Sequence, residues 1–150
     1  DAGVQVKGID NLLIRLSKCC NPVPGDDIVG FITKGRGVSV HRADCTNVHT
    51  EDAKERLIDV EWENQPSTTR KEYNVEIEIL GYDRRGLLNE VLQAVNETKT
   101  NISSVSGKSD RNKVATINMA IAISNINHLQ KVVERIKQIS DIYSVRRMMN

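Results

Sequence analysis

The chain has 150 residues, of which 39% are hydrophobic and 27% charged, and its formal net charge is +1. This composition excludes a disordered chain and a strongly basic nucleic-acid-binding arm, although it allows a local basic patch. No apolar run is long enough to cross a membrane, and an odd number of cysteines with an adjacent pair does not fit a secreted disulfide framework, so we expect a protein of the reducing cytoplasm with no membrane partner.

All three cysteines lie in one stretch, CCNPVPGDDIVGFITKGRGVSVHRADC, from Cys19 to Cys45. With His41 they supply four thiolate or imidazole ligands, the number that a closed tetrahedral zinc site takes. Adjacent cysteines on a strand point to opposite faces, so both reach one ion only if the backbone turns; the two prolines that follow allow such a turn. Two interpretations stay open, namely free cysteines packed in the core, or a zinc site formed by Cys19, Cys20, His41 and Cys45.

The segment ITKGRGVSV within this stretch predicts a strand, a tight turn and a second strand. We expect Gly35 and Gly37 to supply the positive φ angles that a tight turn requires. Cations without an acid lie along this hairpin, in a half of the chain that is otherwise acidic, and cations on a rigid turn suit recognition of RNA phosphates and 2′-hydroxyls. The alternative is a turn that is only solvated. The candidate RNA-contacting residues are Arg15, Lys18, Lys34, Arg36, His41 and Arg42.

A polar stretch, ENQPSTTRKE at residues 63–72, is typical of a linker. We place a first domain at residues 1–66, the linker at 67–71 and a second domain at 72–150. Lysine and arginine number 8 against 11 aspartate and glutamate in residues 1–66, and 13 against 9 in residues 67–150. Because the two halves differ in the sign of their charge, we expect them to have different partners.

Strand and helix patterns alternate in the second half. YNVEIEIL alternates apolar and charged residues, as half-buried strands do. Apolar residues then recur with helical spacing from Arg84 to Asn96, and Asp83 just before them is the expected N-cap. Further strands are predicted at 100–109, 113–123 and 141–148, and a second helix at 127–139.

The resulting order, βαββαβ, predicts four antiparallel strands with both helices on one face. The expected fold class is therefore α+β: a small antiparallel β-rich domain followed by a ferredoxin-like βαββαβ domain. The uncovered sheet face and the edge of the second strand are expected to pair with another copy of the chain, giving a homodimer, or with the first half.

The second half, with GYDRRGLLNEVLQAVNE after its first strand and TNISSVS in its second, resembles the ACT domain, an amino-acid-sensing regulatory module. The cysteine-to-cysteine stretch resembles the zinc-finger-like domain that precedes ACT in the long Rel/SpoT stringent-response proteins. In that family an N-terminal region hydrolyses and synthesises the alarmone (p)ppGpp, while the C-terminal region docks on the ribosome and regulates both activities. No phosphate-binding loop or catalytic motif is recognisable here.

The resemblance therefore implies a regulatory region without catalytic residues of its own, belonging to a longer chain. Its partners would be the catalytic domains of that chain, large-subunit ribosomal RNA and A-site tRNA. If the cysteines and His41 hold a metal, zinc is the expected cofactor, and no other cofactor is expected.

The resemblance also implies an effector site, which in ACT domains lies between the strand-one-to-helix loop of one copy and the second strand of another. Amides at a helix N-terminus suit a carboxylate, and leucine and isoleucine suit a small apolar pocket, so valine or isoleucine is the expected ligand. The loop departs from the usual pattern, because Arg85 stands where proline is frequent. By position, the site residues are Asp83, Gly86, Leu87 and Leu88, with Asn101 and Ile102 from the partner.

Two function classes follow. The first is a ribosome-docking module that regulates a fused alarmone enzyme through the hairpin. The second is an allosteric module that responds to an amino acid bound in the ACT crevice.

Overall fold

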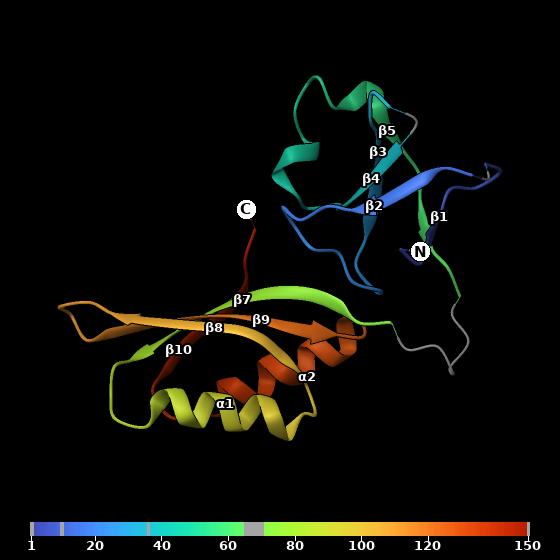
Figure 1. Cartoon of the computed structure of the whole chain (residues 1–150). Helices are drawn as coiled ribbons and strands as arrows, with labels where there is room; N and C mark the ends of the chain where they lie inside the picture. The colour runs from blue at the N-terminus through green and yellow to red at the C-terminus, as the bar shows by residue number, and fades with distance from the viewer. Residues whose placement is uncertain (1, 10, 36, 65–70, 150) are drawn as a thin grey trace. The chain divides into compact units, whose positions relative to one another are not determined.

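The structure, a computed structural model, describes residues 2–9, 11–35, 37–64 and 71–149 (Figure 1). The chain divides between Lys71 and Glu72 into two compact units. Most of the predicted linker, residues 67–70, lies outside the described residues. Within the described part of the chain, no helix has the length and apolar character needed to span a membrane.

The first unit is a small β-rich fold whose strands are β1 (Val4–Gln5), β2 (Leu13–Leu16), β3 (Ile28–Ile32), β4 (Gly37–Arg42), β5 (Leu57–Ile58) and β6 (Glu61–Trp62). Four of them form a sheet in the order β2-β4-β3-β5, and β1 pairs with β6. All pairings are antiparallel except that of β2 with β4. Val38 and Val40 of the central strand β4 are buried against Val4 and Val6, which gives this unit a core of its own.

The predicted hairpin is present, but the reason given for its glycines is wrong. Strands β3 and β4 pair antiparallel, and the Thr33 N–H donates to the Gly37 carbonyl at 2.9 Å. Neither Gly35 nor Gly37 has a positive φ. Space favours glycine at position 37 instead, because a Cβ there would lie 3.0 Å from Thr33 Oγ1 and 3.4 Å from the Leu13 carbonyl oxygen, which is a tight contact.

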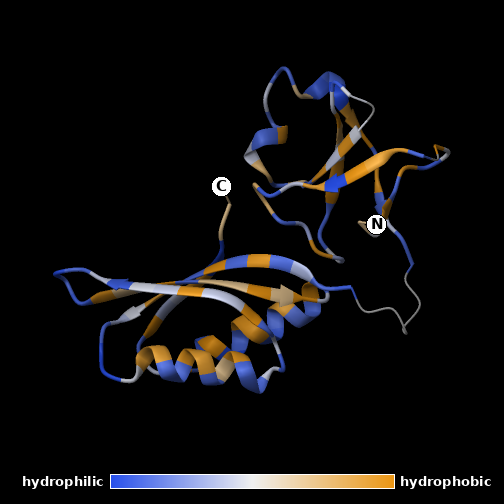
Figure 2. Ribbon diagram, in the orientation of Figure 1, coloured by the Kyte–Doolittle hydropathy of each residue, from blue (hydrophilic) through white to orange (hydrophobic). Residues whose placement is uncertain are grey.

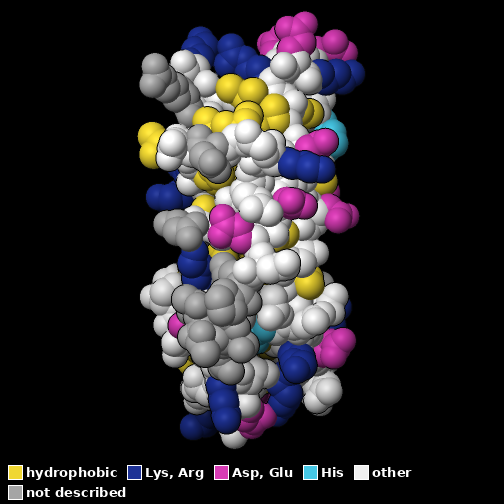
Figure 3. All heavy atoms as spheres, turned by 90° about the vertical axis from the view of Figure 1, so that its right-hand side faces the viewer, with side chains coloured by type: hydrophobic (Ala, Val, Ile, Leu, Met, Phe, Trp, Pro, Cys, Tyr) yellow, Lys and Arg dark blue, Asp and Glu magenta, His cyan; other side chains and the backbone are white. Residues whose placement is uncertain are grey.

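Apolar side chains are also exposed on the first unit, close to this hairpin. Ile9 is 53% exposed and Ile32 43%. Both border a cavity of about 550 Å³ that Val38 also lines. Figure 3 shows hydrophobic side chains gathered on one face, with lysine and arginine side chains beside them.

The second unit confirms the predicted βαββαβ order. Its elements are β7 (Tyr73–Tyr82), α1 (Leu87–Glu97), β8 (Ile102–Ser109), β9 (Val114–Ile123), α2 (Ile126–Lys137) and β10 (Ile142–Arg147). The sheet order is β10-β7-β9-β8 and every neighbouring pair is antiparallel. Both helices cover the same face of this sheet (Figure 1).

Periodic apolar residues explain why these segments form this layer structure. Apolar and polar residues alternate along most of β7, and apolar residues recur around both helices (Figure 2). The apolar set of β7, which includes Ile77 and Ile79, is fully buried, as are Val132 and Ile136 of α2. Truncating one such isoleucine to alanine typically costs about 2–5 kcal/mol, so this layer supplies much of the stability of the unit.

The first helix begins later than predicted, and the predicted N-cap at Asp83 is wrong. Helix α1 starts at Leu87, and its N-cap is Gly86, which has a φ of 86° and no side-chain cap. The Asp83 N–H instead donates to the Lys113 carbonyl at 2.8 Å. Residues 83–86 therefore form a loop between β7 and α1, and glycine permits the left-handed backbone that ends it.

His128 ties the start of α2 to the segment that follows α1. Its Nδ1 accepts from the Ser124 N–H at 3.0 Å, so the proton lies on Nε2, which donates to Thr100 Oγ1 at 2.8 Å. Burial lowers the pKa of His128; Glu72 opposes this shift and Lys131 adds to it. A proton on Nδ1 would break the bond to Ser124.

We therefore expect the second unit to lose stability in mild acid. Because the pKa of His128 is lower in the folded chain than in the unfolded one, the unfolded chain binds the extra proton. The free energy of unfolding should then fall as the pH drops from about 6.5 towards the folded-state pKa, and level off below it. Urea unfolding of the wild type and of His128→Gln at a series of pH values measures this effect. A variant with the same pH slope as the wild type would contradict it.

Candidate functional site

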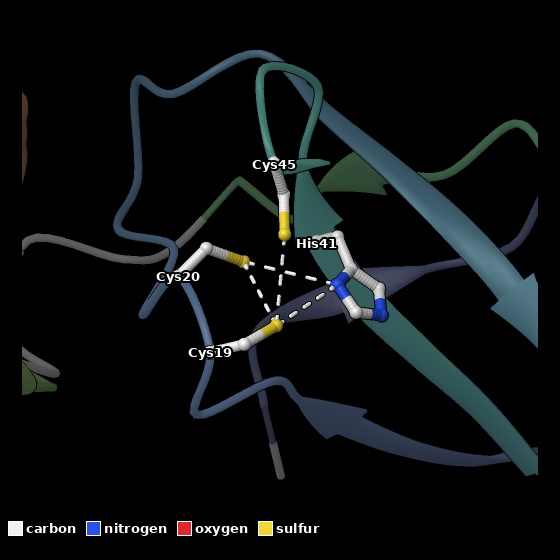
Figure 4. Close-up of side chains that lie close together, drawn as sticks. All are labelled: Cys19, Cys20, His41 and Cys45. Carbon is white, nitrogen blue, oxygen red and sulfur yellow. Dashed lines mark hydrogen bonds between the residues drawn. The ribbon is translucent and has the colours of Figure 1, made fainter. Parts of the chain in front are cut away.

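The four predicted metal ligands come together in the first unit (Figure 4). One ligand atom from each of Cys19, Cys20, His41 and Cys45 lies within 4.8 Å of the others. The Cys19 sulfur lies 3.4 Å from His41 Nδ1, 3.6 Å from Cys45 Sγ and 3.9 Å from Cys20 Sγ. Zinc–sulfur bonds of about 2.3 Å in a tetrahedron place sulfurs roughly 3.8 Å apart, so these separations fit one zinc ion.

The adjacent cysteines reach the same point because the chain turns there. Residues 18–20 form a turn after β2, closed by the Asn21 N–H, which donates to the Ser17 carbonyl at 3.0 Å. Asn21 itself has a φ of 47°. Cys45 follows β4 in a second turn, where its N–H donates to the Arg42 carbonyl at 3.0 Å. The turn required for both adjacent thiols to reach one ion is therefore present.

Hydrogen bonds hold the imidazole and one sulfur in place. His41 Nε2 lies 3.0 Å from Ser17 Oγ and 3.2 Å from Ser39 Oγ, which leaves Nδ1 directed at the thiols. The Arg42 N–H donates to Cys20 Sγ at 3.3 Å. Such a bond favours the charged form of the sulfur, the form that a metal ligand needs.

Burial makes the thiols hard to ionise on their own. It raises the pKa of Cys20 to about 12 and also raises the pKa of Cys45. Burial, followed by the charge of Arg15, lowers the pKa of His41, which favours the neutral imidazole that ligates metals. A divalent cation deprotonates the thiols that it binds. The donor set therefore fits zinc, whose binding would release protons and weaken at low pH.

The predicted RNA-contacting residues that the structure describes do not form one continuous surface. Lys34 is exposed in the turn between β3 and β4. His41 and Arg42 lie at the other end of β4, about 16 Å away for a strand of this length. The His41 ring points into the cysteine cluster, and the Arg42 side chain is 12% exposed and paired with Asp44 at 2.6 Å.

Of the three remaining predicted cations, the structure describes Arg15 and Lys18, which lie near the cluster. Arg15 on β2 and Lys18 in the turn after it are exposed. Arg15 stands opposite Ser39 in the ladder between β2 and β4. Arg36 lies outside the described residues.

In the second unit, the predicted effector residues of the loop after β7 border a cavity of about 450 Å³. The end of β8 forms its other side, so that the lining consists of Asp83, Arg84, Gly86, Leu87, Leu88, Asn89, Gly107, Lys108, Ser109, Ala115 and Ile117. Asn101 and Ile102 lie at the opposite end of β8 and do not line it, which is compatible with their predicted origin in a second copy.

The sequence analysis missed the residues at the end of β8. Antiparallel pairing places the end of β7 beside the start of β9 and hence beside the end of β8. Lys108 and Ser109 could therefore have been predicted to lie near the loop after β7 from the antiparallel order of the strands.

Arg84 was also missed, although it fixes the loop that borders the cavity. Its guanidinium donates to Asp141 at 2.7 Å, to Glu90 at 2.5 Å and to the Ser140 carbonyl at 3.1 Å. The bonds to Glu90 and Asp141 raise the pKa of Arg84. Nothing in the sequence distinguishes this arginine from its neighbour Arg85, because two of its three partners, Ser140 and Asp141, lie more than fifty positions away along the chain.

Comparison with known proteins defines the class to which these two units belong. Residues 4–63 match the RelA/SpoT RIS domain and residues 69–147 match the ACT domain. The GTP pyrophosphokinase of Escherichia coli (strain K12) is 38% identical over 148 residues, which is 97% of this chain and 20% of that protein. The bifunctional (p)ppGpp synthase/hydrolase RelA of Mycobacterium tuberculosis (strain H37Rv) is 38% identical over 149 residues, which is 99% of this chain and 20% of that protein.

Among solved structures, the ACT domain from the GTP pyrophosphokinase of Chlorobium tepidum aligns with 52% of this chain and all of that domain, at 20% identity and a TM-score of 0.47.

The chain therefore belongs to the RelA/SpoT family and comprises its RIS and ACT domains. It spans about a fifth of the length of the curated relatives that it matches. The predicted resemblance to the regulatory C-terminal region of Rel/SpoT proteins is thus confirmed.

We expect protein purified without chelators to contain about one zinc ion per chain, because the four ligands form a complete coordination set. Removing the ion should lower the melting temperature, since metal affinity contributes folding free energy in a small domain. Elemental analysis and calorimetry with and without chelator measure both effects, and Cys45→Ser, which lacks one ligand, should show little response to chelator. Metal-free wild type whose melting curve ignores chelator would contradict the site.

Proposed function

We propose that the chain is the regulatory region of a cytoplasmic stringent-response enzyme that makes and hydrolyses (p)ppGpp, and that it regulates this enzyme by docking on the ribosome. The observation that carries the proposal is 38% identity, over almost the whole chain, to a GTP pyrophosphokinase and to a bifunctional (p)ppGpp synthase/hydrolase. The catalytic domains of the longer protein would be its partners within the same polypeptide.

The docking surface proposed for the first unit consists of exposed cations on rigid elements. Arg15 stands opposite Ser39 in the middle of β4, Lys18 lies next to the cysteine cluster, and Lys34 lies in the turn before β4. Cations spaced along a strand suit an extended polyanion better than a single phosphate group. Ribosomal RNA of the large subunit and A-site tRNA are partners of that kind.

A metal ion in the cluster would make this surface rigid. Cys19 and Cys20 follow β2, whereas His41 and Cys45 lie on and after β4, so one ion would join β2, which carries Arg15, to β4, which begins after the turn that holds Lys34. Cations held in fixed positions lose less conformational freedom on binding, which raises affinity without adding a contact. The metal is thus proposed to support docking from within the domain.

Replacing Lys34 and Arg36, the two cations that the sequence places in the predicted turn, with alanine should weaken binding to ribosomes. The melting temperature should stay nearly unchanged, since charges in turns contribute little to stability. Losing two phosphate contacts should also lower the slope of log affinity against log salt by roughly two. Binding at several salt concentrations measures both effects. The matched control replaces Lys99 and Lys137, two exposed lysines of the second unit, and should leave the slope unchanged. Equal slopes in all three proteins would contradict the docking surface.

A second function, sensing of a branched-chain amino acid, is favoured by the cavity in the ACT unit. Backbone amides at the start of α1 suit a carboxylate, and Leu88, 42% exposed at the cavity, offers an apolar contact. Ile117 adds to the apolar lining. A cavity of about 450 Å³ is large enough for valine or isoleucine.

A second copy of the chain is proposed to complete this site. Strand β8 is an edge strand whose residues 103–109 are all exposed, and it carries only one charge, Lys108, to discourage pairing. Pairing of β8 with β8 of another copy would bring the partner's Asn101 and Ile102 towards the loop after β7.

If this site binds valine, saturation at a hundred times the dissociation constant should stabilise the chain by about 2.7 kcal/mol. Titration calorimetry and thermal shift with valine and isoleucine measure binding. Leu88→Ala should weaken it, because an apolar contact is lost, whereas Tyr143→Ala, an exposed residue outside the cavity, should not. If neither valine nor isoleucine at millimolar concentration gives binding heat or a thermal shift, the proposal that the ACT unit senses a branched-chain amino acid is contradicted.

A further inference from the structure

The cysteine cluster contains one pair of sulfurs placed for reaction with each other. Cys19 Sγ and Cys45 Sγ are 3.6 Å apart, closer than Cys19 Sγ and Cys20 Sγ at 3.9 Å. The two cysteines are 26 positions apart in the sequence. A bond between them would close a long loop and join the turn after β2 to the turn after β4.

Access to reagents differs among the three thiols. Cys20 and Cys45 are each 1% exposed, whereas Cys19 is only partly buried. A reagent from solvent therefore reaches Cys19 first. Cys45 is buried next to Cys19, so its sulfur is placed to attack an oxidised Cys19 and form a disulfide with it.

Cys20 is the thiol least suited to take part. Its sulfur accepts the Arg42 N–H at 3.3 Å and lies farther from Cys19, at 3.9 Å. A disulfide between the adjacent Cys19 and Cys20 would close a small ring, and this departs from the usual spacing of disulfide-bonded residues. Cys20 should therefore remain a thiol when the other two react.

We propose that Cys19 and Cys45 form an oxidation site for hydroperoxides. The Cys19 thiolate attacks the peroxide oxygen, the O–O bond breaks, and Cys19 becomes a sulfenic acid while the peroxide leaves as an alcohol or water. The Cys45 sulfur then attacks the Cys19 sulfur, the S–O bond breaks, and water leaves. In total two thiols lose two electrons and two protons, and one peroxide is reduced.

The product changes the metal site as well as the covalent structure. A bound zinc ion would keep the sulfurs as thiolates, the reactive form, and the disulfide removes two of its four ligands. Release of the ion rests on the proposed zinc site, but formation of the disulfide rests only on the placement of Cys19 and Cys45. Oxidation would then change the structure of the first unit next to the surface proposed to dock on RNA, so that RNA binding would depend on the redox conditions.

The test treats the zinc-loaded chain and the chelator-treated chain with hydrogen peroxide and maps the peptides without reduction. Free thiols should fall from three to one per chain, and the mass should fall by about 2 Da. Cleavage after lysine and arginine leaves Cys19 and Cys20 together on residues 19–34 and Cys45 on residues 43–54. These two peptides should appear joined, and alkylation of the remaining thiol followed by fragmentation should locate it at Cys20.

Variants assign the pair independently. Cys20→Ser should keep the joined peptides, and Cys19→Ser and Cys45→Ser should lose them. A dithiol reductant should restore three thiols in the wild type. Joined peptides in Cys19→Ser, a bond within residues 19–34, or Cys19 oxidised further without a crosslink would overturn the proposal. A crosslink that forms without release of zinc would refute the metal site alone.

Discussion

The close approach of three cysteine sulfurs and one imidazole holds the turn after β2 next to β4 in the first unit. The sheet of this unit is small, and Cys20 and Cys45 form a second cluster with Val48 in addition to the apolar core around β4. Burial disfavours ionised thiols, as the raised pKa of Cys20 and Cys45 shows. A metal ion reverses this preference by binding the thiolates. Metal binding by these four side chains would therefore affect the stability of the first unit, the ionisation of its thiols and the position of β4 in the hairpin.

The second unit depends on a different constraint, the burial of one sheet face by two helices. Its apolar residues alternate with polar ones along most of β7, so one face is packed and the other carries polar groups such as Glu78, which pairs with Arg146 at 2.8 Å. Arg84 then fixes the loop after β7 against the turn before β10. This arrangement leaves a cavity at one end of the sheet, next to an edge strand.

Much of this fold could be predicted from the sequence, because period-two and helical patterns are local. The order βαββαβ, the hairpin and the turn at Cys19 and Cys20 all follow from neighbouring residues. What failed depended on contacts across the chain. Asp83 has the chemistry of an N-cap, yet the pairing of its N–H with Lys113 places it outside the helix. Space for a side chain at Gly37 is limited because Thr33 and Leu13 approach it, and the approach of Leu13 is not visible in any local pattern.

The candidate sites show the same division. The ligand types at Cys19, Cys20, His41 and Cys45 were evident from the sequence, and the structure brings them together. The prediction that the basic residues share one surface did not hold for Lys34, His41 and Arg42. Strand β4 separates Lys34 from Arg42, and the His41 ring faces the thiols and not the outside of the hairpin.

The central claim is that the metal-held first unit docks the chain on the ribosome. Its most direct test is sedimentation with ribosomes of the zinc-loaded wild type and of Cys45→Ala, with folding of the ACT unit checked in both by hydrogen exchange. We predict that the variant keeps a protected ACT sheet and loses ribosome binding at moderate salt. Equal binding by the two proteins would contradict the claim.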